Sequence, residues 1–365
     1  MIFRFIPLAA ARRQVSSRAT QVLAAVAMTL MGLVFTVETG AARPFVDAAG
    51  RTVEVPERAR RVLAAGPPAS VLLYTLAPET MIGWVRAPSP DEAAFLSPET
   101  RGLPAYGRLT GKGNTANVEA VLTLKPDLII DVGSTASTYA SLADRVQAQT
   151  GIPYILLDGG IDRTGETYAK LGELVGAPER AAELAAHAEA MIAEVEGRID
   201  SIPADRRPRV YYARGPRGLE TGVSGSITTE ILDRAGARNV AEGGGATGLT
   251  TISPEQILAW DPDAIVTLDP AFHRTLSTDP LWSTLRAVRA GRVYQTPRLP
   301  FGWFDSPPGT NRLIGLRWLA ALLYPDLFPE PMDSITRDFY TRFYHVNLDT
   351  AQVETLLKDA GAARP

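Results

Sequence analysis

The sequence predicts an α/β fold with two lobes, each built on parallel strands, and a long helix between them. Apolar runs rich in β-branched residues alternate with helical patterns over residues 61–157 and again over residues 209–295. This alternation is typical of βα units that form a parallel sheet. Between the two regions lies a stretch dense in Ala, Glu and Leu, from about residue 163 to 199. A length of 365 residues allows one to three domains with a sizeable core.

Composition excludes several classes of protein. The chain is 45% hydrophobic and 21% charged, unlike a disordered, collagenous or multispanning membrane chain. A net charge of −3 and a pI near 5.8 argue against a nucleic-acid binder, which normally shows a basic domain or stripe. Cysteine is absent, which excludes disulfides, thiolate metal sites, cysteine nucleophiles and a lipid-modified N-terminal cysteine.

Residues 1–42 are predicted to be a cleavable signal peptide. The apolar run over residues 22–37 has 16 residues and would span about 24 Å as a helix. A helix that crosses a membrane needs roughly 20 residues, so this run is too short. Four arginines precede the run, and the small residues Gly40, Ala41 and Ala42 follow it, which suits signal peptidase. An uncleaved anchor and a twin-arginine signal remain alternatives. Removing four Arg and one Glu, a net +3, leaves −6 on the exported part, which we expect in a Gram-negative periplasm.

The N-terminal lobe is expected to cover residues 43–162. Its predicted strands and helices alternate along the chain, at residues 61–65 (strand), 70–76 (helix), 128–131 (strand), 139–150 (helix) and 154–157 (strand). A helical linker over residues 163–200 follows. Its second half begins at Pro178, a good first-turn residue, and would form a helix of about 33 Å. The C-terminal lobe, residues 201–365, has predicted strands at 209–213, 264–268 and 292–295.

One segment occurs twice. Residues 119–130 read Glu-Ala-Val-Leu-Thr-Leu-Lys-Pro-Asp-Leu-Ile-Ile, and residues 255–266 read Glu-Gln-Ile-Leu-Ala-Trp-Asp-Pro-Asp-Ala-Ile-Val. In each copy a short helix starts at a capping residue, Asn117 or Ser253, and Pro-Asp then turns the chain into a buried strand. The two lobes therefore repeat one motif, and both glutamates belong to the first turn of a helix.

Four features follow one another along the chain. They are an opening at residues 45–56 that we predict as strand, turn and helix, the repeated motif, the helix between the lobes, and the ending Phe-Tyr-x-x-Phe-Tyr at residues 339–344. In this order they resemble the periplasmic solute-binding proteins of iron-siderophore, haem and cobalamin ABC importers, the helical-backbone type of metal receptor. The resemblance covers nearly all of residues 43–350. It implies two Rossmann-like lobes joined by a single long α-helix, a ligand cleft between the lobes and little hinge closure.

The resemblance also implies partners. These are an inner-membrane permease dimer with its cytoplasmic ATPase, and a small metal-containing ligand; we expect a monomer without a cofactor of its own. In the family, one glutamate on each lobe pairs with arginines of the two permease subunits, and Glu119 and Glu255 match these positions. A second interpretation of both glutamates is that the helix dipole alone favours them, by about 0.3–1 kcal/mol.

Ligand contacts are expected from loops at the carboxyl ends of the strands. Arg108 and Arg214, one in each lobe, present a fork of donors that suits carboxylates, catecholates and oxyanions. Aromatic residues near these loops are predicted to pack against the organic shell of a chelate. They are Tyr106, Tyr212, Trp303 and Phe304. For each of these residues, a surface arginine or a core aromatic is the alternative interpretation.

Residues 300–317 form the most unusual segment. They resemble the subset of the family that binds molybdate, tungstate and small metal chelates, and the alternative is that Trp303, Asp305 and Arg312 only lock a loop. The three histidines show no clustered spacing, which disfavours capture of a bare metal ion. A second hypothesis is an exported hydrolase or other enzyme on a bilobal scaffold. Its nucleophile is not found, since Ser226 replaces the last Gly of a nucleophile elbow.

Overall fold

The computed structural model describes residues 42–111, 118–242, 248–358 and 360–361. From Ala42 onward the chain forms one compact unit. The predicted signal peptide lies outside the described residues except for Ala42, and so does the predicted helix cap Asn117. Within the described ranges, no helix combines the length and the apolar character that a membrane crossing needs.

The first sheet is parallel, with the strand order β3-β4-β5. Its strands are β3 (Val62–Ala64), β4 (Leu128–Gly133) and β5 (Tyr154–Asp158). Both faces of β4 are covered, because Leu128 and Ile130 belong to one apolar cluster and Ile129 to another. This double burial explains why the strand is an unbroken apolar run. The helices of this half are α2 (Pro67–Leu76), α3 (Pro90–Ala93), α4 (Val118–Leu124) and α5 (Ser137–Thr150).

The chain opens with a hairpin, so the predicted helix after the first turn is wrong. Strands β1 (Ala42–Val46) and β2 (Thr52–Pro56) pair antiparallel. The apolar residues of β2 alternate with polar ones, and Val53 and Val55 are buried, which is the period of a strand. Asp47 closes the turn, because its Oδ1 accepts the backbone N–H groups of Ala49 and Arg51, both at 3.0 Å.

The second sheet is also parallel, with the strand order β11-β10-β6-β8. Its strands are β6 (Arg209–Ala213), β8 (Arg238–Asn239), β10 (Ala264–Thr267) and β11 (Val293–Gln295). A separate antiparallel ribbon pairs β7 (Glu220–Gly222) with β9 (Leu249–Thr251). The helices of this half are α8 (Glu230–Arg234), α9 (Pro254–Trp260), α10 (Pro270–Thr275) and α11 (Arg286–Arg289). The prediction of two α/β lobes with parallel strands is confirmed.

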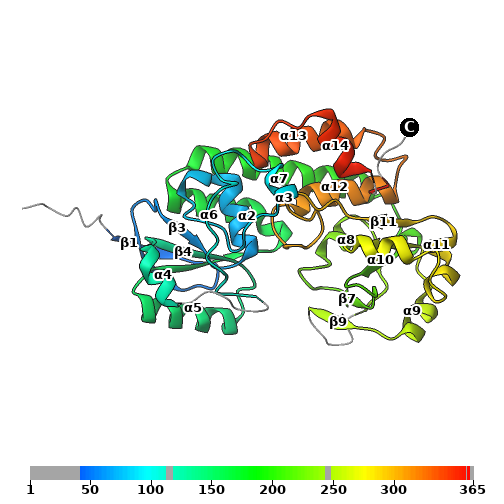
Figure 1. Cartoon of the computed structure of the whole chain (residues 1–365), viewed down its shortest axis with the longest axis horizontal. Coiled ribbons are helices and arrows are strands. Elements are labelled where there is room, and N and C mark those ends of the chain that lie inside the picture. The colour runs from blue at the N-terminus through cyan, green and yellow to red at the C-terminus, as the bar shows by residue number, and fades with distance from the viewer. Residues whose placement is uncertain (1–41, 112–117, 243–247, 359, 362–365) are drawn as a thin grey trace, which may run out of the picture. The chain divides into compact units, whose positions relative to one another are not determined.

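The long helix between the sheets is α7 (Pro178–Ile199), of 22 residues. It follows α6 (Thr164–Val175), which ends at Gly176 in the left-handed conformation with a φ of 68°. Pro178 stands in the first turn, where a missing N–H costs no hydrogen bond. Figure 1 shows α7 beside α6 and α12, and residue contacts link it to both helices. The predicted helix from residue 178 to about 200 is therefore confirmed.

The last helices are α12 (Arg312–Leu323), α13 (Met332–Tyr344) and α14 (Thr350–Leu357). Helix α13 packs against α2 of the first half. The hydroxyl of Tyr74 donates to the carbonyl of Tyr344, and the Nε2 of His345 lies 3.0 Å from the Tyr74 carbonyl oxygen. Tyr74 and Tyr344 are fully buried in one shared apolar cluster. The end of the chain thus completes the core of the N-terminal lobe.

The two copies of the repeated segment adopt the same structure. Each forms a short helix, α4 or α9, that leads into a central strand, β4 or β10. Lys125 and Asp261, at equal positions, both end the helix with a positive φ, of 47° and 38°. Two residues later, the carboxylate of Asp127 accepts the N–H of Arg61 at 3.0 Å, and that of Asp263 accepts the N–H of Arg209 at 2.8 Å. The aspartate therefore fixes the start of the neighbouring parallel strand in both lobes.

A buried arginine of α12 connects the two halves. The Arg312 Nη1 donates to the Ile227 carbonyl and to the Glu230 carboxylate, both at 2.9 Å, and its Nη2 donates to the Gly159 carbonyl beyond β5. Glu230 in turn accepts the N–H of Ile161 at 3.1 Å. The side chain of Arg312 is only 2% exposed. This set of bonds fixes the end of β5 against the start of α8.

Candidate ligand site at the carboxyl edges of the two sheets

In the N-terminal lobe, a loop over residues 105–111 is bound to the carboxyl end of β3. The N–H groups of Leu109 and Thr110 donate to the Ala65 carbonyl, at 2.7 and 3.2 Å. This places Tyr106 and Arg108, both partly exposed, beside the end of the strand. The carboxyl ends of parallel strands are where α/β folds leave a crevice. Arg108 therefore lies near the carboxyl edge of the first sheet.

The ring of Tyr106 is packed rather than open to solvent on all sides. A Cβ added to Gly83 would lie 2.5 Å from the Tyr106 ring, so the backbone of Gly83 approaches the ring closely. The N–H of Tyr106 donates to the Trp84 carbonyl at 2.9 Å. The loop is consequently held in place by both its backbone and its aromatic ring.

In the C-terminal lobe, Arg214 directly follows β6 and belongs to a cluster of four side chains. Its Nη1 donates to the Asp305 carboxylate and, at 3.1 Å, to the hydroxyl of Tyr212. The Tyr212 ring stacks on Phe304 with 4.1 Å between the centroids. Arg214 is 21% exposed, and within the described residues its Nε and Nη2 have no hydrogen-bond partner. Two donor groups of an oriented guanidinium remain unused.

Burial sets the charges of this cluster. Burial raises the pKa of Asp305, and the adjacent Arg214 guanidinium and Tyr212 hydroxyl oppose this shift. Burial, followed by the charge of Asp305, raises the pKa of Tyr212 well above its ordinary value. Tyr212 is therefore neutral, and its hydroxyl donates a hydrogen bond to Asp305. The carboxylate fixes the direction of Arg214 and offsets part of its positive charge.

Three of the predicted ligand-contacting aromatics are fully buried. Tyr212, Trp303 and Phe304 each have an exposed fraction of 0%. The Nε1 of Trp303 donates to the Tyr340 hydroxyl at 3.2 Å, and a Cβ on Gly315 would lie 1.7 Å from the Trp303 carbonyl oxygen. These side chains pack the loop of residues 300–311 onto α12 and α13, and they have no surface to offer a ligand in this structure.

The two glutamates of the repeat are exposed, one in the first turn of α4 and one in that of α9. The Ser253 hydroxyl caps α9 by accepting the N–H of Gln256 at 3.2 Å. Hydrogen bonds from its own backbone N–H and from Ser253 lower the pKa of Glu255. Both lobes thus display a carboxylate at the same position of the repeat.

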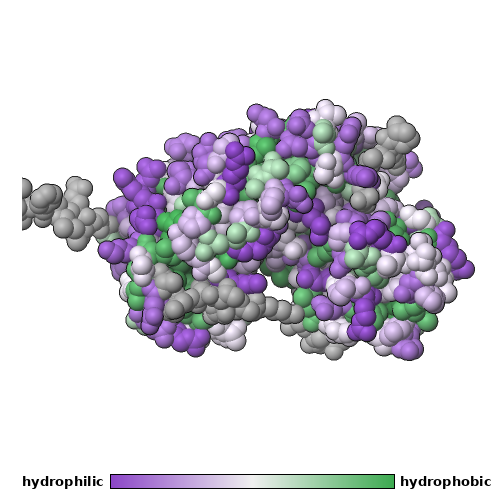
Figure 2. Space-filling view, in the orientation of Figure 1, coloured by the Kyte–Doolittle hydropathy of each residue, from purple (hydrophilic) through white to green (hydrophobic). Residues whose placement is uncertain are grey.

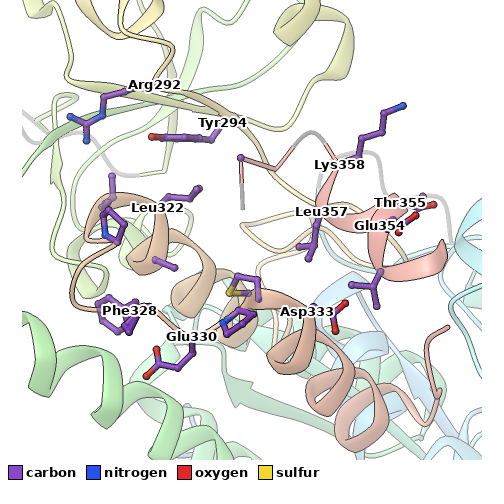
Figure 3. A pocket seen from close by; sticks show the side chains of 18 of the residues that line it. Arg292, Tyr294, Leu322, Phe328, Glu330, Asp333, Glu354, Thr355, Leu357 and Lys358 are labelled. Carbon is purple, nitrogen blue, oxygen red and sulfur yellow. The ribbon is translucent and has the colours of Figure 1, made fainter. Parts of the chain in front are cut away.

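A large groove lies away from these residues. It has a volume of about 1320 Å³ and lies between β11, α12, α13 and α14. Figure 3 shows Arg292 and Tyr294 from the region of β11, Leu322 from α12 and Leu357 from α14 around it. No predicted site residue lines this groove. Figure 2 shows a separate notch in the surface, between the parts formed by the two lobes.

Two of the three histidines, His187 and His345, contact other parts of the fold. Across the part of the chain that the structure describes, no three His, Cys, Asp or Glu side chains come together as a group that could hold a metal ion. His187 contacts Arg342 with 2.7 Å between Nε2 and Nη1, and His345 contacts the backbone of α2. The cationic groups at the strand ends are arginines, so the site is suited to an anion.

Comparison with known proteins agrees with this geometry. Residues 90–299, more than half of the chain, match the family model described as periplasmic binding protein. The chain belongs to the periplasmic binding protein family. As the substrate-binding component of an ABC importer, this periplasmic binding protein works with a permease and an ATPase, in the periplasm or outside the cell. The family predicted from the motifs is confirmed, and the enzyme hypothesis is not supported.

Relatives of this periplasmic binding protein are named for different ligands. The molybdate-binding protein MolA of Haemophilus influenzae is 27% identical over 282 residues, which is 69% of this chain and 75% of the relative. A cobalamin-binding protein of Halobacterium salinarum is 26% identical over 264 residues, 68% of this chain and 65% of the relative. An ABC transporter solute-binding protein from Sulfurospirillum deleyianum is 31% identical, with a TM-score of 0.79 over 87% of this chain and 99% of the other.

A buried acid beside the Arg108 loop was missed from the sequence of this periplasmic binding protein. Asp131 of β4 is 5% exposed, and its Oδ1 accepts the hydroxyl of Thr110 at 3.1 Å and the N–H of Val132 at 3.0 Å. The Tyr154 hydroxyl lies 3.3 Å from its Oδ2. Burial raises the pKa of Asp131 to about 6, although these hydrogen bonds oppose the shift. Its position within an apolar strand was the available signal.

Replacing Asp131 with asparagine is expected to stabilise the protein by about 2 kcal/mol at pH 7 and by little at pH 4. In the wild type, the raised pKa means that the contribution of Asp131 to stability is complete below about pH 3.9 and is lost as the pH rises through about 6. An amide keeps the acceptor for Thr110 and never ionises. Urea unfolding from pH 4 to pH 7 measures the difference. The exposed Asp326 serves as the control through Asp326→Asn, and an equal, flat difference for both variants would contradict the prediction.

Proposed function

We propose that this binding protein captures a small metal oxyanion of the molybdate and tungstate class and delivers it to its permease. The observation that carries the proposal is the presence of one partly exposed arginine at the carboxyl edge of each sheet, Arg108 and Arg214. A planar guanidinium presents parallel donors that match two oxygens of an oxyanion. The similarity to a molybdate-binding relative supports the same class of ligand.

The burial of the aromatics favours a compact anion over a bulky organic chelate. A siderophore, haem or cobalamin needs apolar walls, and Tyr212, Trp303 and Phe304 are packed inside the loop instead. Arg214 is oriented before any ligand arrives, because Asp305 and Tyr212 hold its Nη1. Preorganisation of this kind lowers the entropy cost of binding. The Nη2 group of Arg214 then supplies a donor to an oxygen of the ligand, whereas its Nε is buried.

The proposal also includes how the protein docks on its permease and how it is exported. Glu119 and Glu255 would pair with arginines on the two subunits of a permease dimer, and the binding protein would act as a monomer. Support comes from their exposure at equal positions of the repeat. A cleavable signal peptide over residues 1–42 would carry the chain to the periplasm, and the absence of cysteine excludes a lipid anchor on that residue.

The experiment is a thermal-shift and calorimetry panel on the mature protein. Molybdate and tungstate are expected to raise the melting temperature by mass action, since a ligand at 100 times its Kd adds about 2.7 kcal/mol. Ferric siderophores, haem, cobalamin and nickel-histidine are expected to produce no shift. Native mass spectrometry with metal analysis identifies what the protein carries from the cell. If an organic chelate alone stabilises the protein, the ligand is that chelate and the proposal of an oxyanion is wrong.

Conservative variants locate the ligand. Arg108→Lys and Arg214→Lys keep the positive charge but remove the fork of donors, so each is expected to weaken molybdate binding about 10-fold or more. Exposed arginines near each site provide matched controls through Arg101→Lys and Arg217→Lys, which are expected to bind molybdate as the wild type does. If all four variants bind molybdate with equal affinity, Arg108 and Arg214 do not contact the ligand.

A further inference from the structure

Large apolar side chains are rarely exposed in this protein, and two of them occupy the same place in the repeat. Among the described residues, the exposed large hydrophobics are Val46 at 54%, Leu122 at 43%, Tyr139 at 38% and Leu258 at 45%. Leu122 and Leu258 are each the fourth residue of their copy of the repeated segment. Their exposed fractions are also nearly equal. Neither leucine entered the prediction of the docking surface from the sequence.

The residues just before these leucines in the repeat, Val121 and Ile257, pack in the core. Val121 is 1% exposed and Ile257 is 0% exposed, and they too stand at equal positions. In a helix, residues three apart lie on one face, so Leu122 lies beside Glu119 and Leu258 beside Glu255. Helices α4 and α9 therefore each turn apolar side chains inward, among them Val121 and Ile257, and show a carboxylate and a leucine to the outside. In Figure 1, α4 is found at the left and α9 at the right.

The fold gives no reason for the exposed pair. A single exposed leucine is ordinary on a protein surface. Two leucines at equal positions, each one helical turn from an exposed glutamate, form a surface that is displayed twice. Since the inward positions already anchor each helix, polar residues would serve the fold equally well at 122 and 258. A surface displayed twice suits a partner that presents two like surfaces.

We propose that Leu122 and Leu258 are paired apolar anchors of the docking surface, each entering an apolar pocket beside a cation on one of two like permease subunits. This inference rests on the proposed docking role of Glu119 and Glu255. An exposed ion pair contributes little by itself, because water screens it. Burial of a leucine next to the pair excludes water and supplies attraction that does not depend on salt. The charges then orient the complex and the leucines hold it.

The test measures binding of the mature protein to its cognate permease–ATPase complex in nanodiscs. The variant Leu122→Ser/Leu258→Ser is expected to bind at least 10-fold more weakly, while its melting temperature and its shift with molybdate stay unchanged. Each single substitution is expected to give part of the loss. The other two exposed hydrophobics supply the matched control, Val46→Ser/Tyr139→Ser, which is expected to bind as the wild type does.

A second pair of variants separates this inference from the proposed function. If Glu119→Ala/Glu255→Ala abolishes binding and the double leucine variant binds normally, the leucines are not anchors and the docking role of the glutamates stands. If both double variants bind normally, docking occurs elsewhere and both proposals fall. A loss of equal size in the Val46→Ser/Tyr139→Ser control would show a general effect of surface polarity and would overturn the assignment. Raising the salt concentration is expected to weaken the wild type less than the leucine variant.

Discussion

Replacing Arg312 with methionine is expected to lower the free energy of unfolding by about 3–5 kcal/mol. The substitution keeps most of the volume of the side chain but removes every hydrogen bond that it makes. The Glu230 carboxylate loses its buried cation, and the carbonyls of Gly159 and Ile227 lose their donor. A buried group left without its partner costs more than the bond itself contributes. The bonds between the end of β5 and α8 weaken at the same time.

Urea unfolding at pH 7 measures this loss, provided that the slope against urea stays constant. The control is Arg163→Met, which removes an ion pair to Glu166 from the same region of the chain. Arg163 is 61% exposed and its pair is 3.5 Å long, so the change is expected to stay within about 0.5 kcal/mol. If Arg312→Met loses no more than this control, the joint between the lobes does not depend on Arg312.

The double variant Glu119→Ala/Glu255→Ala is expected to abolish uptake while leaving the affinity for ligand unchanged. Both carboxylates are exposed, on α4 and α9, and neither belongs to the proposed ligand contacts, so we expect ligand binding to be independent of them. Uptake of labelled molybdate measures transport in cells that lack their own copy of the gene. Calorimetry with molybdate measures affinity on the purified variant. Loss of affinity together with uptake would refute the docking roles.

The helix dipole provides an alternative reason for both glutamates, and a third glutamate tests it. Glu179 is exposed in the first turn of α7 and lies outside the repeat. Glu179→Ala therefore removes the same favourable dipole interaction, about 0.3–1 kcal/mol, without touching the proposed docking surface. Normal uptake by this variant, against none in the double variant, assigns the effect to docking.

Local patterns in the sequence predicted most of the fold. The strand at residues 209–213 is β6 without change, and the helix predicted from Pro178 ends at Ile199. The strand and the helix were both predictable because the spacing of apolar residues and the residues that begin or end an element are local features of the sequence. The opening hairpin was predicted wrongly as strand, turn and helix because the segment of residues 45–56 is short. The alternation of polar and apolar residues over Thr52–Pro56 is the pattern of a strand. The repeat predicted a shared structure, and the agreement extends to positive φ values at both Lys125 and Asp261.

The candidate site was harder to predict because its contacts join residues far apart in the chain. Arg214 and Asp305 are separated by 91 positions, and no local pattern pairs them. An aromatic ring can pack in the apolar core or line a ligand site, and the sequence pattern is the same in both cases. The burial of Trp303 and Phe304 assigns both rings to the core. The proposed roles of Arg108 and Arg214 stay predictions until ligand binding is measured.

The contact of α13 with α2 has a consequence for the order in which the protein matures. Tyr344 lies 270 positions after Tyr74, yet its ring fills the core beside Tyr74 and its backbone carbonyl accepts a hydrogen bond from the Tyr74 hydroxyl. A ribosome makes residues 42–162 well before it makes α13. The N-terminal lobe therefore lacks part of its apolar core until α13 has been added, and it cannot complete its folding as an independent unit.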